Sequence, residues 1–249
     1  MDSFENKTIK SIVTSDFRAA AIFEKYSLDF CCKGGVTINQ ACLEKNVDAT
    51  LVFAELNQLA TASNDNIPHY SEWPLDELID YIIKIHHKYV SESSTIIYAH
   101  TQKVAAVHGS NHAEVIEIAR HFESVADELR NHMIKEEHIL FPYIKSLVNA
   151  KRSGSSFNPP PFGTIQNPIN MMEAEHSSAG DALYQVRTLT NNYTPPEDAC
   201  TTYRVSFKEL QQFENDLHKH VHLENNILFP KAIALEQELI ASNVEVGIG

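Results

Sequence analysis

Glycine is scarce in this sequence, with eight residues among 249, and runs that alternate apolar and polar residues are rare. A half-buried β-strand needs that two-residue alternation, so its rarity excludes a mainly β protein. Apolar residues instead recur every three to four positions along most of the chain, which is the spacing of an amphipathic helix. The sequence therefore predicts an all-α protein.

Positive charge is also in short supply. The chain has 20 lysine and arginine residues against 33 aspartate and glutamate residues, a formal net charge of -13. Such a surface repels nucleic acids and anionic membranes, and no basic patch offsets it. No apolar run approaches the ~18 residues of a transmembrane helix, and the N-terminus lacks the charged-then-apolar pattern of a signal peptide. We expect a cytoplasmic protein that binds neither nucleic acid nor membrane.

Cysteine is limited to Cys31, Cys32, Cys42 and Cys200, whose spacing gives neither a CxxC motif nor a secreted disulfide framework. Cys31 and Cys32 are adjacent, and a disulfide between neighbours closes only through a strained ring. They are either two small residues before the Gly34-Gly35 turn or a thiol site for metal binding or redox exchange.

Two polar linkers, "TASNDNIPHYSE" and "KRSGSSFNPPPFG", divide the chain. Residues 1–60 read as the short helices of a small N-terminal domain, and residues 74–240 as a second domain with four long helical stretches. These stretches are predicted to begin at Pro74, near Ser110 or Asn111, at Asn167-Pro168, and after Thr194-Pro195-Pro196.

One motif occurs twice in the second domain. The segments "HMIKEEHILFP" and "HVHLENNILFP", which begin at His132 and His220, share a histidine, a glutamate four residues later, and the tail Ile-Leu-Phe-Pro. Because proline lacks an amide proton, it is predicted to kink or end each helix. A further histidine, His87 or His176, precedes each motif by nearly the same number of residues. The repeat predicts two helical hairpins that together form a four-helix bundle.

Polar residues occupy core positions in this bundle. The apolar stripes read Ile118, Phe122, Val125, Leu129, His132, Glu136 and Ile139 on the second helix, Ile169, Met172, His176, Ala179, Leu183 and Val186 on the third, and Leu210, Phe213, Leu217, His220, Glu224 and Ile227 on the fourth. Burying an unpaired carboxylate costs on the order of several kcal/mol, and two at one depth would also repel. A positive group is therefore expected between the two glutamates.

That group is interpreted as a pair of metal ions. On the first helix, Ile79 and Ile83 lead to either His86 or His87, and the spacing does not choose between them. A single buried histidine is usually a satisfied core residue, but four histidines and two glutamates in matched register indicate ligands. If each glutamate bridges, each metal receives two nitrogens and two oxygens, with positions left for an oxo bridge or a small ligand. This donor set fits iron, and zinc and manganese stay open.

The sequence resembles a known family in several segments. These are "YSLDFCCKGG", "HMIKEEHILFP", "MMEAEHSSAG", "NNYTPPEDACTT" and "HKHVHLENNILFP". They resemble the RIC (repair of iron centres) di-iron proteins of the YtfE/ScdA type, and the resemblance covers nearly the whole chain. It implies a hemerythrin-like four-helix bundle behind a small helical double-cysteine domain, in a cytoplasmic homodimer.

The resemblance also implies a function and a set of site residues. The function is the repair of iron–sulfur clusters in proteins damaged by nitrosative or oxidative stress. The cofactor would be two non-haem iron ions, bridged by carboxylates and, when oxidised, by an oxo group. The iron ligands would be His87, His132, Glu136, His176, His220 and Glu224. Cys31 and Cys32 match the family's cysteine pair, and His108 matches a further family histidine that is expected in the second shell of the metal site.

Three functions fit these residues. A repair protein would supply iron to damaged clusters, whereas an enzyme would reduce nitric oxide at the diferrous centre, and the sequence does not separate the two. The third is a hemerythrin-like sensor that binds dioxygen or nitric oxide. The cysteine pair favours the first over the third, because a simple gas binder needs no thiols.

Overall fold

The computed structural model describes residues 4–61, 68–155 and 160–246. Within these ranges the regular secondary structure is helical, apart from one isolated antiparallel bridge between Thr8 and Thr37, so the all-α prediction is confirmed. The chain divides into two compact units: residues 1–74 with 221–230, and residues 75–220 with 231–249. Among the described residues, no helix is both long enough and apolar enough to cross a membrane.

The first unit is built from short helices. They are α1 (Ile9–Ser15), α2 (Ala19–Lys25), α3 (Ile38–Lys45) and α4 (Ala49–Thr61), with 3-10 turns at Phe4–Asn6 and Tyr70–Glu72. Thr8 caps α1 by accepting a hydrogen bond from the Ser11 amide, and Thr37 forms a capping box with Gln40 at the start of α3. Buried residues from all four helices, such as Ile9, Phe23, Ile38 and Leu56, give this unit a core of its own.

The turn that carries the cysteine pair is fixed by one carboxylate and one glycine. Asp29 Oδ1 accepts hydrogen bonds from the amides of Cys31 and Cys32, both at 2.9 Å. A Cβ atom at Gly34 would lie 2.5 Å from the carbonyl oxygen of Phe30, a distance that no side chain tolerates. Glycine is therefore required at position 34, where the chain turns back towards α3.

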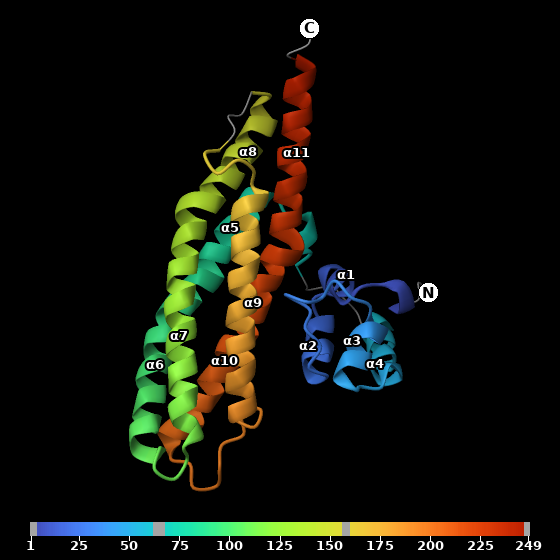
Figure 1. The fold of residues 1–249 in the computed structure, drawn as a ribbon. Helices are drawn as coiled ribbons and strands as arrows, with labels where there is room; N and C mark the ends of the chain where they lie inside the picture. The colour runs from blue at the N-terminus through green and yellow to red at the C-terminus, as the bar shows by residue number, and fades with distance from the viewer. Residues whose placement is uncertain (1–3, 62–67, 156–159, 247–249) are drawn as a thin grey trace. The chain divides into compact units, whose positions relative to one another are not determined.

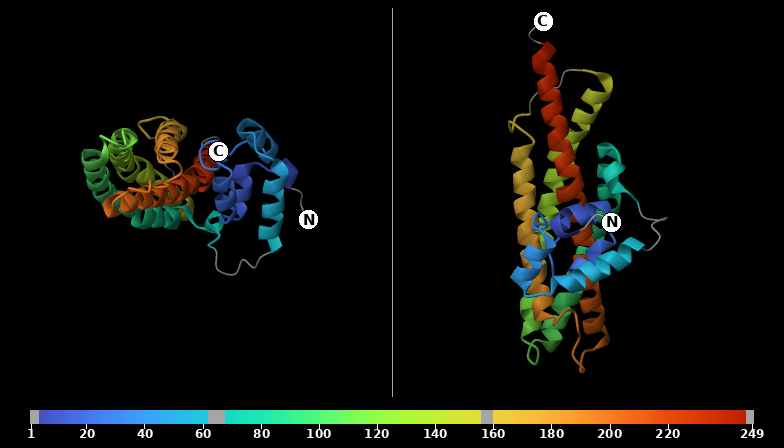
Figure 2. Two further views of the ribbon diagram at one scale, coloured as in Figure 1. Left: turned by 90° about the horizontal axis from the view of Figure 1, so that it is seen from below. Right: turned by 90° about the vertical axis from the view of Figure 1, so that its right-hand side faces the viewer.

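The second unit contains the four-helix bundle (Figures 1 and 2). Its helices are α5 (Leu75–Tyr81) with α6 (Lys88–His108), α7 (Glu114–Lys135) with α8 (Phe141–Ser153), α9 (Gln166–Leu189), and α10 (Thr201–Leu223) with α11 (Phe229–Val246). Helix α7 packs against both α6 and α9. The four long helical stretches predicted from the sequence are thus present, and the predicted fold class is confirmed.

Three of the four stretches contain a π-helical turn where two named helices join. The turns span Ile82–His87, Glu136–Leu140 and Glu224–Leu228. In the second, the Phe141 amide donates to the Glu136 carbonyl, five residues back, and Pro142 follows directly. Of the two predicted effects of proline, a kink or an end, the end does not occur: the wider turn comes before Pro142, and the helix continues. Such turns are frequent at functional sites.

The π-helical turn also overturns one core assignment. The predicted stripes are buried except at Ile139, which is 50% exposed, whereas its neighbour Leu140 is 1% exposed. A π turn takes more residues than an α turn, so the face that points inward moves by about one residue. Three-four periodicity therefore fails beyond Glu136. At the matching position after Glu224, Ile227 is buried all the same, because all five residues of that π turn are buried.

The predicted start of the first stretch at Pro74 is confirmed, because α5 begins at Leu75, but the other predicted starts are off by a few residues. Helix α7 begins at Glu114 instead of near Ser110 or Asn111, α10 begins at Thr201, and α9 begins at Gln166 without a local side-chain cap. The Ile165 amide instead donates to the carboxylate of Glu236 in α11, at 3.0 and 3.1 Å. A cap supplied from a distant helix leaves no local signal. Parts of the two predicted linkers, residues 62–67 and 156–159, lie outside the described residues.

Candidate metal centre

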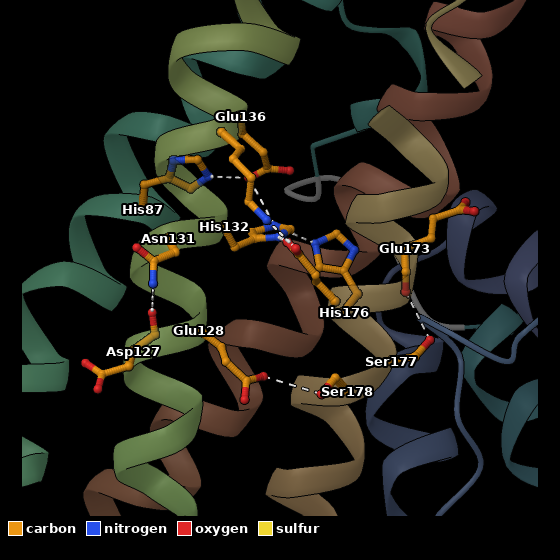
Figure 3. A network of polar contacts seen from close by, with 12 residues as sticks. His87, Asp127, Glu128, Asn131, His132, Glu136, Glu173, His176, Ser177 and Ser178 are labelled. Carbon is orange, nitrogen blue, oxygen red and sulfur yellow. Dashed lines mark hydrogen bonds and ion pairs between the residues drawn. The ribbon is translucent and has the colours of Figure 1, made fainter. Parts of the chain in front are cut away.

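Six candidate ligands come from all four stretches of the bundle. His87 ends the first π turn, His132 lies in the last turn of α7, and Glu136 opens the π turn that follows. His176 lies within α9, while His220 and Glu224 repeat the positions of His132 and Glu136 at the end of α10. All six are between 0 and 2% exposed. Figure 3 shows His87, His132, Glu136 and His176 pointing towards one another.

The six side chains form two overlapping groups that could each hold a metal ion. One group is His87, Glu136, His220 and Glu224, and the other is His132, Glu136, His176 and Glu224. Within each group, one ligand atom per residue lies within 4.8 Å of all the others. Both groups share the same two carboxylates, so the arrangement suits two neighbouring cations with glutamates between them.

Glu136 lies between the two groups. Its Oε2 atom is 3.3 Å from His132 Nε2 and 3.4 Å from His87 Nε2, and these imidazoles belong to different groups. His132 Nε2 also lies 3.0 Å from His176 Nε2. The Nε2 atoms of His87 and His132 thus face one buried carboxylate, and His176 Nε2 lies next to that of His132 (Figure 3). Four imidazoles and two carboxylates form a nitrogen and oxygen donor set that suits iron, zinc or manganese.

Two of these histidines contact a further carboxylate through Nδ1, the ring nitrogen that faces away from the centre. His87 Nδ1 lies 2.7 Å from Glu137 Oε1, and His132 Nδ1 lies 2.8 Å from Glu175 Oε2. A carboxylate on Nδ1 fixes the tautomer that leaves Nε2 free to bind a metal. Neither carboxylate is predicted from the sequence, although Glu137 follows Glu136 directly and Glu175 precedes His176.

The carboxylate of Glu175 also forms an ion pair with Lys135. Burial raises the pKa of its carboxyl, but hydrogen bonds from Lys135 and His132 outweigh burial and hold the pKa below its ordinary value. Its second oxygen contacts Lys135 Nζ. The carboxylate therefore stays charged, as an acceptor for the His132 N–H must.

The structure separates the two histidines that the spacing left open. His87 joins a group of possible ligands, whereas His86 Nδ1 lies 3.0 Å from Asp216 Oδ1. Both are buried, and the ring of His86 stacks on that of His220 with 5.7 Å between the centroids. The grouping favours His87 as the ligand.

The cysteine pair forms a third, smaller group in the first unit. Cys31 and Cys32 are free thiols whose sulfur atoms lie 3.7 Å apart, and Asp29 Oδ1 lies 3.4 Å from Cys31 Sγ. One ligand atom from each of the three residues lies within 4.8 Å of the other two. The hydrogen bond to Cys32, together with burial, raises the pKa of Cys31 well above its ordinary value. Cys31 is therefore held as a thiol.

His108 does not lie beside the predicted ligands. It is the last residue of α6, and the helical rise places it about 30 Å along the helix from His87. Its Nε2 atom instead lies 3.2 Å from Cys200 Sγ. The predicted place of His108 near the metal ligands is not the one that the structure gives.

Fold and site together define a class of protein, a hemerythrin-like cation-binding bundle that follows a small double-cysteine domain. Comparison with protein families agrees: residues 5–60 match the ScdA_N domain, described as a domain of unknown function, and residues 78–232 match the hemerythrin HHE cation binding domain. Proteins named iron-sulfur cluster repair protein YtfE are similar over 237 residues, 94% of this chain and 100% of theirs. The identity is 36% for those of Enterobacter sp. (strain 638) and Citrobacter koseri, and 34% for that of Escherichia coli O8 (strain IAI1). The chain belongs to the YtfE family of iron–sulfur cluster repair proteins.

Proposed function

We propose that this protein repairs iron–sulfur clusters damaged by nitrosative or oxidative stress and that its bundle holds the iron for that task. One observation carries the proposal: Glu136 and Glu224 belong to both groups of possible ligands. Two cations that share two carboxylates form a single centre, in which the loss of one ion weakens the hold on the other. The names of the relatives support cluster repair as the use of this centre.

Iron is the metal that we propose for both positions. The ligands would be His87, His132, Glu136, His176, His220 and Glu224, all between 0 and 2% exposed. When bound, the ions would supply exchangeable ferrous iron and one-electron chemistry. The chain offers two nitrogens and two bridging carboxylates to each position, fewer donors than six-coordinate iron takes. The coordination positions that the chain does not fill support nitric oxide or dioxygen as small ligands of the iron.

The side chains around the centre position the ligands and limit access by water. Glu137 and Glu175 orient the imidazoles of His87 and His132 through their Nδ1 atoms. The buried rings of Phe122, Phe141 and Phe213 belong to the same bundle core. A site buried to this degree retains metal at rest, so release to a client requires a partner or a change at the centre.

We propose that Cys31 and Cys32 act in the repair step. Their thiols lie 3.7 Å apart and share the turn with Asp29, an arrangement suited to a transient hold on iron in transfer. We also propose that the protein is a cytoplasmic homodimer. Measurement of its molecular mass in solution tests the dimer. The clients would be damaged iron–sulfur proteins.

The test is repair of a nitric-oxide-damaged cluster enzyme by the anaerobically purified protein, loaded with iron or freed of it. The proposal predicts that only the loaded form restores activity, with loss of iron from the bundle. An isotopic label on the bundle iron separates the alternatives. Label that appears in the client supports delivery, whereas nitrous oxide production without transfer of the label supports nitric oxide reduction.

A further inference from the structure

A second cluster of ligating side chains lies at the far end of the bundle. His108 ends α6, His112 lies in the turn before α7, and Asp198 and Cys200 lie just before α10. Figure 1 shows the α6–α7 turn and the α9–α10 loop at the same end of the bundle. Because His108 lies about 30 Å along α6 from His87, this cluster is separate from the candidate metal centre.

The four side chains form two close donor pairs. His108 Nε2 lies 3.2 Å from Cys200 Sγ, and His112 Nε2 lies 3.1 Å from each carboxylate oxygen of Asp198. Ligand atoms around a tetrahedral cation such as zinc lie roughly 3.5 Å apart, given metal–ligand bonds of about 2.0–2.3 Å. Each pair already has nearly that separation. The ring centroids of the two histidines are 6.5 Å apart, so the two pairs are neighbours, and a shared cation would require side-chain rotation that brings all four ligand atoms together.

His112 is oriented in the same way as the ligand candidates in the bundle centre. Its Nδ1 atom lies 3.2 Å from Glu114 Oε1, while its Nε2 atom faces Asp198. His87 and His132 likewise have a carboxylate on Nδ1 and turn Nε2 towards their centre. A carboxylate on the remote ring nitrogen is the usual companion of a metal-bound imidazole.

Tyr203 points independently to a missing ligand. It is 1% exposed, and its hydroxyl has no hydrogen-bond partner among the described residues. The rings of His108 and His112 lie 5.1 and 5.9 Å from its ring. Burial and the charges of Glu114 and Asp198 raise the pKa of Tyr203 to about 12, so the phenol keeps its proton close to these carboxylates. An unsatisfied buried hydroxyl costs about 1–3 kcal/mol, and a water on a bound cation would satisfy it.

We propose that His108, His112, Asp198 and Cys200 form a second site, for a divalent cation of the zinc or ferrous type. Thiolate and imidazole donors select such borderline cations over magnesium or calcium. Asp198 and Cys200 are exposed, so a cation reaches them from solvent. On binding, the sulfur of Cys200 gives its proton to the solvent and forms the bond to the metal, without any change of oxidation state.

Titration with cobalt(II) tests this site in the full-length protein whose bundle has first been loaded with iron. Cobalt bound to a thiolate gives a charge-transfer absorption band, and we expect one additional cobalt per chain with that band. Cys200→Ser should abolish the band, and His108→Gln, His112→Gln and Asp198→Asn should each weaken cobalt binding at least tenfold. His121→Gln, a partly buried histidine of α7 outside the cluster, should bind cobalt like the wild type.

The other thiols provide the decisive control. The Cys31→Ser, Cys32→Ser double variant should keep the full band. A band that persists in Cys200→Ser, or that disappears in the double variant, would place the cobalt elsewhere and overturn the proposal. Wild-type binding by His108→Gln and His112→Gln would do the same. Iron content is measured in the same samples, so the outcome is independent of the bundle centre and of cluster repair.

Discussion

The imidazole of His132 is fixed by Glu175, whose Oε2 atom lies 2.8 Å from His132 Nδ1. This contact joins α7 to α9 and turns Nε2 of His132 towards Glu136, at 3.3 Å. Glu175 is not one of the six proposed ligands, yet it sets the direction in which one of them points. The first prediction tests this relationship.

Glu175→Gln should weaken metal binding by about tenfold to a hundredfold, the usual effect of losing an outer carboxylate. The amide cannot support the histidine as a charged acceptor does. Competition with a chelator of known affinity measures the change. Glu173→Gln is the matched control, because this exposed glutamate lies on the same helix and should leave the affinity unchanged. Equal metal affinity in the two variants would show that Glu175 does not position His132 for metal binding.

Loss of either shared glutamate should empty both metal positions. Glu136 and Glu224 belong to both groups of possible ligands, so Glu136→Ala or Glu224→Ala removes an oxygen from each position at once. Elemental analysis of the anaerobically purified variants, made in the Cys200→Ser background, should find less than one metal per chain. A clean single occupancy in either variant would show that the glutamates do not bridge.

The cysteine pair should matter for repair and not for folding. Cys31 and Cys32 are partly exposed residues; Cys31 packs against the buried core of its unit, and neither residue belongs to that core. The Cys31→Ser, Cys32→Ser double variant should therefore keep its iron and melt near the wild-type temperature, while repair of a damaged cluster falls at least tenfold. Repair at the wild-type level would show that the two cysteines serve only as small residues before a turn.

One ion pair predicts a dependence of stability on pH. Arg152 in the last turn of α8 holds both oxygens of Asp76 in α5, at 2.6 and 2.9 Å, and keeps the pKa of Asp76 below its ordinary value of 3.8. A lowered folded-state pKa stabilises the protein above the unfolded value, and this stability is lost as the pH falls through the folded value. Asp76→Asn should cost about 0.2–1 kcal/mol at pH 7, since the pair is partly exposed.

Urea unfolding at several pH values checks this prediction. The difference between wild type and Asp76→Asn should stay constant from pH 7 to about 5 and shrink below about 4. Glu92→Gln, which alters a looser and more exposed pair with Lys88, serves as control and should change little. A difference that grows on acidification would contradict the assigned role of Asp76.

The sequence predicts most of the bundle because its pattern is local. Buried positions such as Phe122, Leu129 and Leu217 follow three-four spacing, and polar residues in the same stripes mark His132 and Glu136. The π turns interrupt that spacing, which explains the misplaced Ile139. The sequence shows the proline that follows each of two π turns. It does not show the backbone hydrogen bonds before the proline, which decide whether the helix ends or continues.

What the sequence does not predict depends on contacts between distant segments. Glu175 meets His132 across 43 positions of the chain, and Glu236 caps α9 across 71. His108 was expected beside the metal ligands because a family motif contains it, yet helical rise carries it to the other end of α6. Spacing assigns a face of a helix, whereas a partner on another helix requires the packed structure.

The central claim is that six side chains of the bundle hold two metal ions in one shared centre. Iron(II) titration into the metal-free protein, in the Cys200→Ser background and without oxygen, tests it most directly when binding and melting temperature are followed together. The account predicts saturation at two irons per chain. It also predicts about 2.7 kcal/mol of added stability for each bound iron at a hundredfold excess over the dissociation constant, or roughly 5–10 °C in melting temperature per iron. Saturation at one iron, or binding without any rise in the melting temperature, would contradict a shared two-metal centre in the core.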